Sequence, residues 1–135
     1  MFEEEKENEF EIKKCKLVFI GDSGVGKTTI ISRFIKGTFE NNYDSTNGAT
    51  FANKKIEYKD KKICLQFDIW DTAGQEKFRS LAKFFYKDAG IAILVYDITR
   101  VESFNGLKDF WMKQLKNNSG SNISKKYIIY FYYYI

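Results

Sequence analysis

The sequence predicts an α/β fold in which helices cover both faces of a mostly parallel central sheet, giving three layers. A short run at residues 14–20 that ends in LVFI, and a continuous apolar run at residues 91–96, are typical of buried strands. Segments with helical spacing of apolar residues alternate with these runs, and strands that alternate with helices usually lie parallel in one sheet. With 135 residues, 44% of them hydrophobic, the chain is long enough for one domain with one core.

The N-terminal residues 1–13 are charged and lack periodicity, so we expect a flexible acidic extension. The formal net charge of the whole chain is +4, and the basic surplus is spread along the rest of the sequence. Because no block or helical stripe of Lys and Arg stands out, we expect no nucleic-acid partner.

The first strand, at residues 14–20, leads through a glycine-rich turn into a helix predicted at residues 28–36. Within that helix, four apolar residues recur at helical spacing on one side: Ile30, Ile31, Phe34 and Ile35. Gly37 then acts as a stop signal, and the polar residues 37–50 fit a loop.

Two extended runs, at residues 51–58 and 62–71, are separated by a short polar turn and predict an antiparallel hairpin. A second flexible segment is predicted to begin at Thr72 and to lead into a helix that ends near Tyr86. After the strand at residues 91–96, Ser103 is predicted to cap a helix over residues 103–116. The apolar residues expected near one face of this helix are Phe104, Leu107, Phe110, Trp111 and Leu115.

The C-terminal part, residues 117–135, combines a polar loop with the aromatic run YIIYFYYYI. This run could form one more strand, but its composition is also that of an aggregation-prone segment. It is too short to span a bilayer, so we expect no transmembrane segment.

Residues 21–28, GDSGVGKT, match the phosphate-binding pattern GxxxxGK[ST] in full and lie between a predicted strand and helix. Glycines let the backbone N–H groups turn towards phosphate oxygens, and the helix N-terminus adds a positive dipole end. The Lys27 ammonium suits the β and γ phosphates, and the Thr28 hydroxyl suits Mg²⁺. The residues expected at the phosphates are Ser23, Gly24, Val25, Gly26, Lys27, Thr28 and Thr29.

A second group of candidate residues follows the predicted strand at residues 62–71. Asp71 lies at a strand end beside the phosphate loop, where its carboxylate could hold a water bound to Mg²⁺. Gly74 can bring its backbone N–H to a γ-phosphate, and the Gln75 amide can orient an attacking water. Gln75 is therefore the candidate catalytic residue.

Together, GDSGVGKT and WDTAGQEKF resemble the Ras superfamily of small GTPases, whose fold is the P-loop G domain. More narrowly, STNGATF, SLAKFFYKDAG and VYDIT are similar to the Rab branch and especially to its early-endosomal subgroup. The resemblance covers residues 14–116, so we expect a partial G domain there.

The resemblance implies GTP or GDP as ligand, Mg²⁺ as cofactor, and effectors, exchange factors and GTPase-activating proteins as partners. Thr46 would contact Mg²⁺ and the γ-phosphate, and Phe39 would pack on the guanine. Phe51, Trp70 and Phe85 would form the aromatic triad that Rab proteins present to effectors; ordinary core packing is the alternative for these three.

Several departures from the family pattern stand out. Asn47 replaces a usual Ile in the effector region, and Asp88 replaces a usual Gly, which we expect to alter a surface rather than the fold. After Lys116 the NKxD motif and the closing elements do not appear, so we expect a chain truncated at its C-terminus with weak guanine preference. No C-terminal Cys pair or CaaX box provides a prenylation site, so we expect a cytoplasmic protein, bound peripherally to endosomal membranes only in a longer lipidated form.

Three functions compete at this point. The first is a Rab-like GTPase that hydrolyses GTP as a switch in vesicle trafficking, with slow intrinsic hydrolysis because no arginine of this chain is evident at the γ-phosphate. The second is a truncated, non-catalytic fragment that binds Rab regulators or effectors without cycling nucleotide. An ATP-dependent P-loop kinase is the third, although the DTAGQ segment has no role in it.

Overall fold

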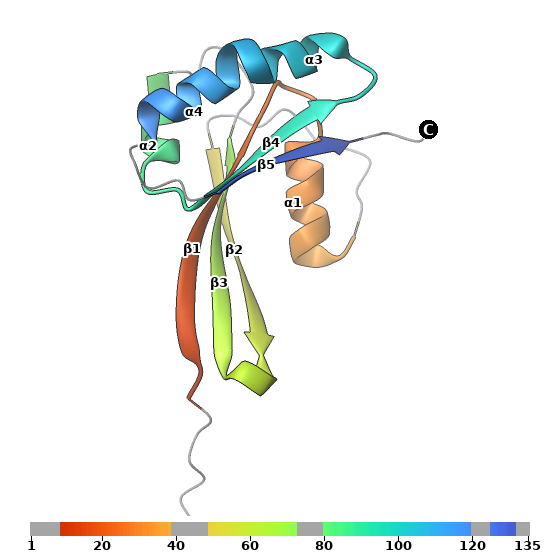
Figure 1. The fold of residues 1–135 in the computed structure, drawn as a ribbon. Coiled ribbons are helices and arrows are strands. Elements are labelled where there is room, and N and C mark those ends of the chain that lie inside the picture. Colours follow the sequence, from red (N-terminus) through yellow and green to blue (C-terminus); the bar gives the residue numbers. More distant parts are fainter. Residues whose placement is uncertain (1–8, 39–48, 73–79, 120–124, 132–135) are drawn as a thin grey trace, which may run out of the picture.

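A computed structural model describes residues 9–38, 49–72, 80–119 and 125–131 and contains a five-stranded sheet with helices on both of its faces (Figure 1). The strand order is β2-β3-β1-β4-β5, and all neighbouring pairs are parallel except the β2–β3 pair. The predicted α/β class with a mostly parallel sheet is therefore confirmed.

Strand β1 (Glu11–Ile20) lies at the centre of the sheet and begins three residues before its predicted start. The Glu11 N–H donates to the Lys62 carbonyl at 2.8 Å, and residues 11–13 pair with β3 (Ile63–Thr72). The predicted boundary of the flexible extension at residue 13 was thus wrong, because exposed charged residues can extend a strand by backbone pairing alone.

The hairpin of β2 (Ala49–Tyr58) and β3 is confirmed, with the short 3₁₀ turn η1 (Lys59–Lys61) between the two strands. Strand β3 continues through Thr72, where we predicted a flexible segment to begin. The Thr72 side chain is buried, and its hydroxyl donates to the Phe19 carbonyl of β1 at 2.6 Å. This bond fixes the end of β3 against the centre of the sheet.

The sheet separates two apolar layers. Helix α1 (Lys27–Lys36) covers one face, where Ile31 packs with five buried side chains of the strands and the phosphate loop: Leu17, Phe19, Val25, Ile69 and Val95. Helices α2 (Ala82–Tyr86), α3 (Val101–Gly106) and α4 (Met112–Asn118) lie on the other face (Figure 1). There they bury Val18, Ile20, Tyr86, Leu94, Leu107, Trp111 and Leu115. The three-layer prediction is confirmed.

The long helical segment after β4 (Ile91–Asp97) begins at Val101, so the prediction of Ser103 as its cap was wrong. Ser103 is instead buried, accepting a hydrogen bond from the Asp97 N–H at 2.9 Å and donating to the Arg100 carbonyl at 2.7 Å. Its side chain ties the first turn of α3 to the end of β4.

A π-turn, η3 (Leu107–Trp111), joins α3 to α4. In a regular α-helix, residues four apart drift by about 40° per step, so a buried row at this spacing would leave the core. The wider π-turn takes back part of this drift. Leu107, Trp111 and Leu115 are accordingly all buried, whereas Phe104 remains 45% exposed, against the expected buried face.

Strand β5 (Lys125–Phe131) pairs parallel with β4, which supports the strand alternative for the start of the aromatic tail. The predicted loop is shorter than expected, since α4 extends to Asn118 and β5 begins at Lys125. None of the helices in the described ranges is long and apolar enough to cross a membrane.

Candidate functional site

The phosphate loop follows β1 and requires glycine at its first position. Gly21 has a φ of +151°, and a Cβ atom there would lie 2.1 Å from the Val95 carbonyl oxygen. Gly24 and Gly26 also have positive φ values of 76° and 97°, and Gly26 forms the N-cap of α1. The loop therefore turns sharply against β4 before it enters the helix, as the sequence pattern predicted.

Lys27 lies inside this loop. Its side chain is buried, and its Nζ donates to the Gly21 and Asp22 carbonyls, both at 2.8 Å. Burial lowers the pKa of the Lys27 ammonium to about 8, although the nearby carboxylates of Asp71 and Asp22 partly oppose this shift. A phosphate ligand would supply the negative charge that favours the protonated form.

Thr28 and Asp71 meet at the junction of α1 and β3. The Thr28 hydroxyl donates to Asp71 Oδ2 at 2.5 Å, and the Asp71 residue is 4% exposed. Asp71 pairs with Phe19 at the carboxyl end of β1, which places its carboxylate beside the phosphate loop. The structure thus brings together the hydroxyl and the carboxylate that the sequence predicted as magnesium ligands.

The chemistry of this oxygen pair fits Mg²⁺, a hard cation that prefers oxygen ligands and keeps several waters or phosphate oxygens. In the part of the chain that the structure describes, no group of three or more His, Cys, Asp or Glu side chains could hold a metal. A hydroxyl and one carboxylate leave most coordination positions to a nucleotide and water. They suit an ion that arrives with its nucleotide better than a metal held by protein alone.

Four predicted site residues lie outside the described residues. Phe39 and Thr46 fall within residues 39–48, and Gly74 and Gln75 fall within residues 73–79. Their roles at the guanine, the γ-phosphate and the attacking water stay predictions. Asn47, which departs from the family pattern in the effector region, also falls within residues 39–48.

The predicted aromatic triad is assembled by three elements. Phe51 of β2 packs edge-on against Trp70 of β3 with ring centroids 5.4 Å apart, and Trp70 lies 5.9 Å from Phe85 of α2. Trp70 and Phe85 are partly buried against the core, whereas Phe51 is 54% exposed. The triad therefore lies partly in the core, through Trp70 and Phe85, and partly at the surface, through Phe51.

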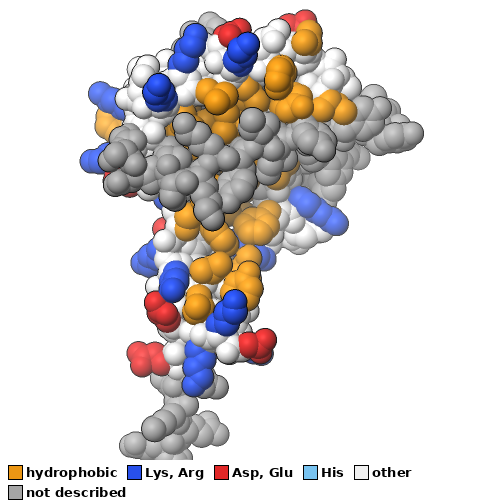
Figure 2. Space-filling view, viewed as in Figure 1, with side chains coloured by type: hydrophobic (Ala, Val, Ile, Leu, Met, Phe, Trp, Pro, Cys, Tyr) orange, Lys and Arg blue, Asp and Glu red, His pale blue; other side chains and the backbone are white. Residues whose placement is uncertain are grey.

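Exposure alone does not mark the triad as an interface. Figure 2 shows apolar side chains at the surface over the helices and along strands β1, β2 and β3. Charged residues of both signs lie among the apolar side chains of these strands. Outside the triad, the exposed apolar residues include Ile12, Phe84 and Val101. The distinguishing feature of the triad is its continuous ring contact.

Asp88 is exposed, as expected, but it also affects the backbone. Its φ is +59°, in the left-handed region that glycine adopts most readily. The expectation of a purely surface effect was therefore incomplete: the aspartate adds backbone strain at the turn between α2 and β4. Its charge also acts on Lys16, whose Nζ donates to the Lys87 carbonyl at 2.7 Å.

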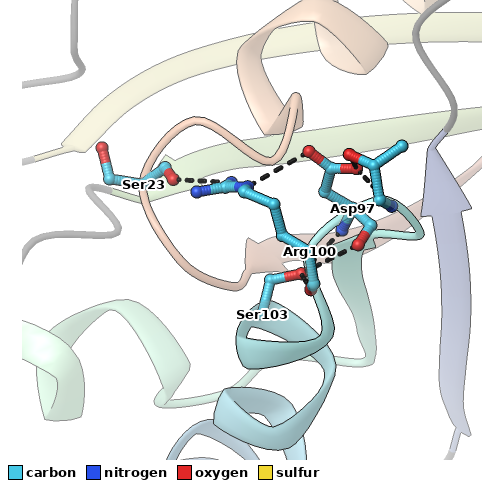
Figure 3. A network of polar contacts seen from close by, with 5 residues as sticks. Ser23, Asp97, Arg100 and Ser103 are labelled. Atoms are coloured by element: carbon cyan, nitrogen blue, oxygen red, sulfur yellow. Dashed lines mark hydrogen bonds and ion pairs between the residues drawn. The ribbon is translucent and has the colours of Figure 1, made fainter.

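A polar network that the sequence analysis did not predict borders the phosphate loop (Figure 3). Arg100 Nη2 donates to the Ser23 carbonyl at 3.2 Å, and its Nε contacts Asp97 Oδ2 at 3.1 Å. Thr99 donates to the same carboxylate through its backbone N–H and its hydroxyl. The Thr99 hydrogen bonds, with help from Arg100, lower the pKa of Asp97.

A second missed contact joins the loop to the end of the π-turn: Trp111 Nε1 donates to Asp22 Oδ1 at 2.6 Å. The sequence carried one faint signal for each contact, a charged residue after a strand end and a Trp on an apolar face. Neither signal identifies a partner, because 77 residues separate Arg100 from Ser23 and 89 separate Trp111 from Asp22.

Comparison with known proteins agrees with this geometry. The sequence model of the Ras family matches residues 16–129 of this chain. The chain is 43% identical over 112 residues to Ras-related protein Rab-22A of Homo sapiens, covering 83% of this chain and 56% of that protein. It is 46% identical over 110 residues to Ras-related protein Rab-13 of Canis lupus familiaris, with coverage of 82% and 53%.

A third relative, GTP-binding protein YPT52 of Saccharomyces cerevisiae (strain ATCC 204508 / S288c), is 42% identical over 113 residues, covering 79% of this chain and 48% of that protein. The chain thus spans about half the length of the relatives that it matches. Since the family match extends over most of the chain and the phosphate loop has the expected geometry, the protein belongs to the Ras family and is similar to its Rab members.

Proposed function

We propose that this protein binds GTP and GDP together with Mg²⁺ and hydrolyses GTP as a switch in vesicle and endosomal membrane trafficking. The observation that carries the proposal is the pairing of Thr28 with Asp71 beside the buried Lys27. A hydroxyl and a carboxylate that suit Mg²⁺, and an ammonium that suits phosphate, lie next to one loop of positive-φ glycines.

Each residue of this site has a distinct task. The backbone N–H groups from Ser23 to Thr29 would bind phosphate oxygens, and Lys27 would exchange its carbonyl partners for the β and γ phosphates. Thr28 would ligate Mg²⁺ directly and Asp71 through a water, and the bound ion would neutralise charge that develops on the phosphates.

Residues outside the described ranges complete the proposed reaction. Gln75 would orient the attacking water, and the Gly74 N–H would contact the γ-phosphate. Thr46 would add a contact to Mg²⁺, and Phe39 would cover the guanine. Hydrolysis without a partner should be slow, because the Arg100 guanidinium beside the loop is already held by Asp97 and Ser23.

The triad of Phe51, Trp70 and Phe85 is the proposed surface for effectors, while exchange factors and GTPase-activating proteins would act on the nucleotide site. The proposed location is the cytoplasm, with peripheral binding to endosomal membranes by a lipidated form. The partially exposed, contiguous rings support this role because aromatic side chains dominate many binding interfaces.

The test is single-turnover GTP hydrolysis with and without a GTPase-activating protein of the Rab type. Replacing Gln75 by Leu should abolish stimulated hydrolysis while GTP binding persists, because only the water-orienting amide is lost. Gln114→Leu, the same change on α4, is the matched control and should leave hydrolysis unchanged. Equal stimulated rates for Gln75→Leu and the unmodified protein would remove Gln75 from the mechanism.

A binding module without nucleotide cycling is the competing function, and the assembled triad is the observation that favours it. Such a module would bind an effector equally well with GDP, with GTP and without nucleotide. A switch should bind the effector more tightly with GTP. Competition between ATP and GTP distinguishes the kinase alternative from both other functions. Only an ATP-dependent kinase requires that ATP binds at least as tightly as GTP.

A further inference from the structure

The side chain of Asp22 in the phosphate loop docks on the helical segment that follows β4. Trp111 Nε1 donates to Asp22 Oδ1 at 2.6 Å, and the Trp111 residue is 5% exposed. At Gly106 of the same segment, an added Cβ would lie 3.0 Å from both carboxylate oxygens. The carboxylate therefore rests against helix backbone, in a space that a larger residue at position 106 would narrow.

The π-turn contains the donor of this contact. It spans Leu107–Trp111 and keeps Trp111 in one buried row with Leu107 and Leu115. A single π-turn inside an α-helix is uncommon and frequently occurs at a functional site. Here it directs the indole N–H towards the phosphate loop while the indole ring stays in the core.

The next residue of the loop is held from the other end of the same segment. Arg100, the N-cap residue of α3, donates from Nη2 to the Ser23 carbonyl at 3.2 Å. Asp97 holds this guanidinium at 3.1 Å, and Thr99 holds the Asp97 carboxylate in turn (Figure 3). Two consecutive loop residues are thus fixed by two side chains of one helical segment.

These contacts lie close to the residue that would bind phosphate. The Asp22 carbonyl accepts a hydrogen bond from Lys27 Nζ while its carboxylate accepts one from Trp111. A change in the Trp111 contact would therefore shift a carbonyl that positions the Lys27 ammonium. A hydrogen bond to a charged group is stronger than one between neutral groups, so its loss can bias the loop between two arrangements.

We propose that Trp111 and Arg100 are positioning residues that clamp the phosphate loop through Asp22 and Ser23 and thereby lengthen the lifetime of bound nucleotide. This clamp rests on the proposed function, since its effect on lifetime requires that nucleotide binds at the loop. Its effect on the loop itself requires no nucleotide.

The experiment compares Trp111→Phe and Arg100→Ala with the unmodified full chain. The first readout is the dissociation rate of a fluorescent GDP analogue in the presence of Mg²⁺. The second is hydrogen exchange of the backbone amides of residues 21–26 in the nucleotide-free protein. Loss of one charge-assisted hydrogen bond should accelerate both by about tenfold in Trp111→Phe, and Arg100→Ala should do so by a smaller factor.

Matched controls separate positioning from general stability. Leu115→Ala removes buried volume from the same apolar cluster without touching the loop, and Lys113→Ala removes an exposed cation from α4. Both should leave the GDP dissociation rate and the loop exchange unchanged, even though Leu115→Ala lowers the melting temperature. Arg100→Lys keeps a cationic donor and should restore part of the effect lost in Arg100→Ala.

A double variant tests whether Trp111 acts through Asp22. Adding Asp22→Ala to Trp111→Phe should accelerate dissociation and exchange no further than the stronger single change, because each single change removes the same hydrogen bond. Independent, additive effects would overturn the proposed route through Asp22.

The outcomes distinguish the clamp from the proposed function. If the unmodified protein fails to bind GDP while Trp111→Phe still accelerates loop exchange, the nucleotide function is wrong and the clamp holds. If GDP binds but Trp111→Phe changes neither readout, or matches Leu115→Ala in both, the clamp is wrong and nucleotide binding stands.

Discussion

Burial of the Lys27 ammonium makes the stability of the nucleotide-free protein depend on pH. Burial lowers the pKa of this group from 10.5 to about 8 in the folded chain, whereas the unfolded chain keeps the ordinary value. Between these two pKa values the unfolded state binds more protons, so the free energy of unfolding rises with pH in this window. Below about pH 8, Lys27 carries its charge in both states and its full burial cost is present.

The size of the effect follows from the two pKa values. A shift of one pKa unit corresponds to about 1.4 kcal/mol, so this shift predicts a rise of about 2 kcal/mol from roughly pH 7.5 to 9.5. Replacing Lys27 by Met removes the titrating group and keeps a side chain of similar length. The free energy of unfolding of the unmodified protein, minus that of the Lys27→Met variant, should show this rise with pH. The contributions of the other titrating groups cancel in the subtraction.

Urea unfolding of both nucleotide-free proteins at a series of pH values measures this difference. Adding GDP and Mg²⁺ to the unmodified protein should remove the pH dependence, since phosphate raises the pKa of Lys27 towards or above its ordinary value. A difference that stays flat across the window, or falls as pH rises, would show that the ammonium is not held in a desolvated site.

Four further substitutions test the backbone description. Gly21→Ala should lower the free energy of unfolding by at least about 3 kcal/mol or prevent folding, because its Cβ would overlap a carbonyl oxygen. Gly37→Ala, also at positive φ but in open space, should lower it by only about 1 kcal/mol. Thermal unfolding measures both changes. Asp88→Gly should stabilise the protein by about 1 kcal/mol by relieving a positive φ, and a lower melting temperature would contradict this. Ser103→Ala should cost about 1–3 kcal/mol in urea unfolding, because the Asp97 N–H loses its hydroxyl acceptor; no change would show that water replaces it.

The parts of the fold that the sequence predicted best are those encoded locally. The phosphate loop could be predicted because its glycines, Lys27 and Thr28 are neighbours in the chain, and each serves a backbone or charge requirement of the same turn. The hairpin was also predictable, since its two strands are joined by a short polar turn. In both cases a few adjacent residues contain the whole signal.

Features that depend on distant partners could not be predicted. The strand extension to Glu11 depends on backbone pairing with Lys62, and exposed charged residues gave no periodic signal for it. Ser103 is a residue type that commonly caps helices, but its hydroxyl accepts a hydrogen bond from the Asp97 N–H and α3 already begins at Val101. The π-turn and the contact of Trp111 with Asp22 arise only when the helix packs on the sheet.

Calorimetric titration of the full chain with GDP, with and without Mg²⁺, tests the central claim most directly. We expect saturable binding of one GDP, weakened at least about tenfold by removal of Mg²⁺, which takes away the bridging ion, and by Thr28→Asn, which takes away the hydroxyl proposed to ligate it. Lys113→Ala, at an exposed position on α4 away from these oxygens, should leave the GDP affinity unchanged. No binding of GDP, or binding that is indifferent to Mg²⁺ and to Thr28→Asn, would contradict the assignment of this loop as a magnesium-dependent nucleotide site.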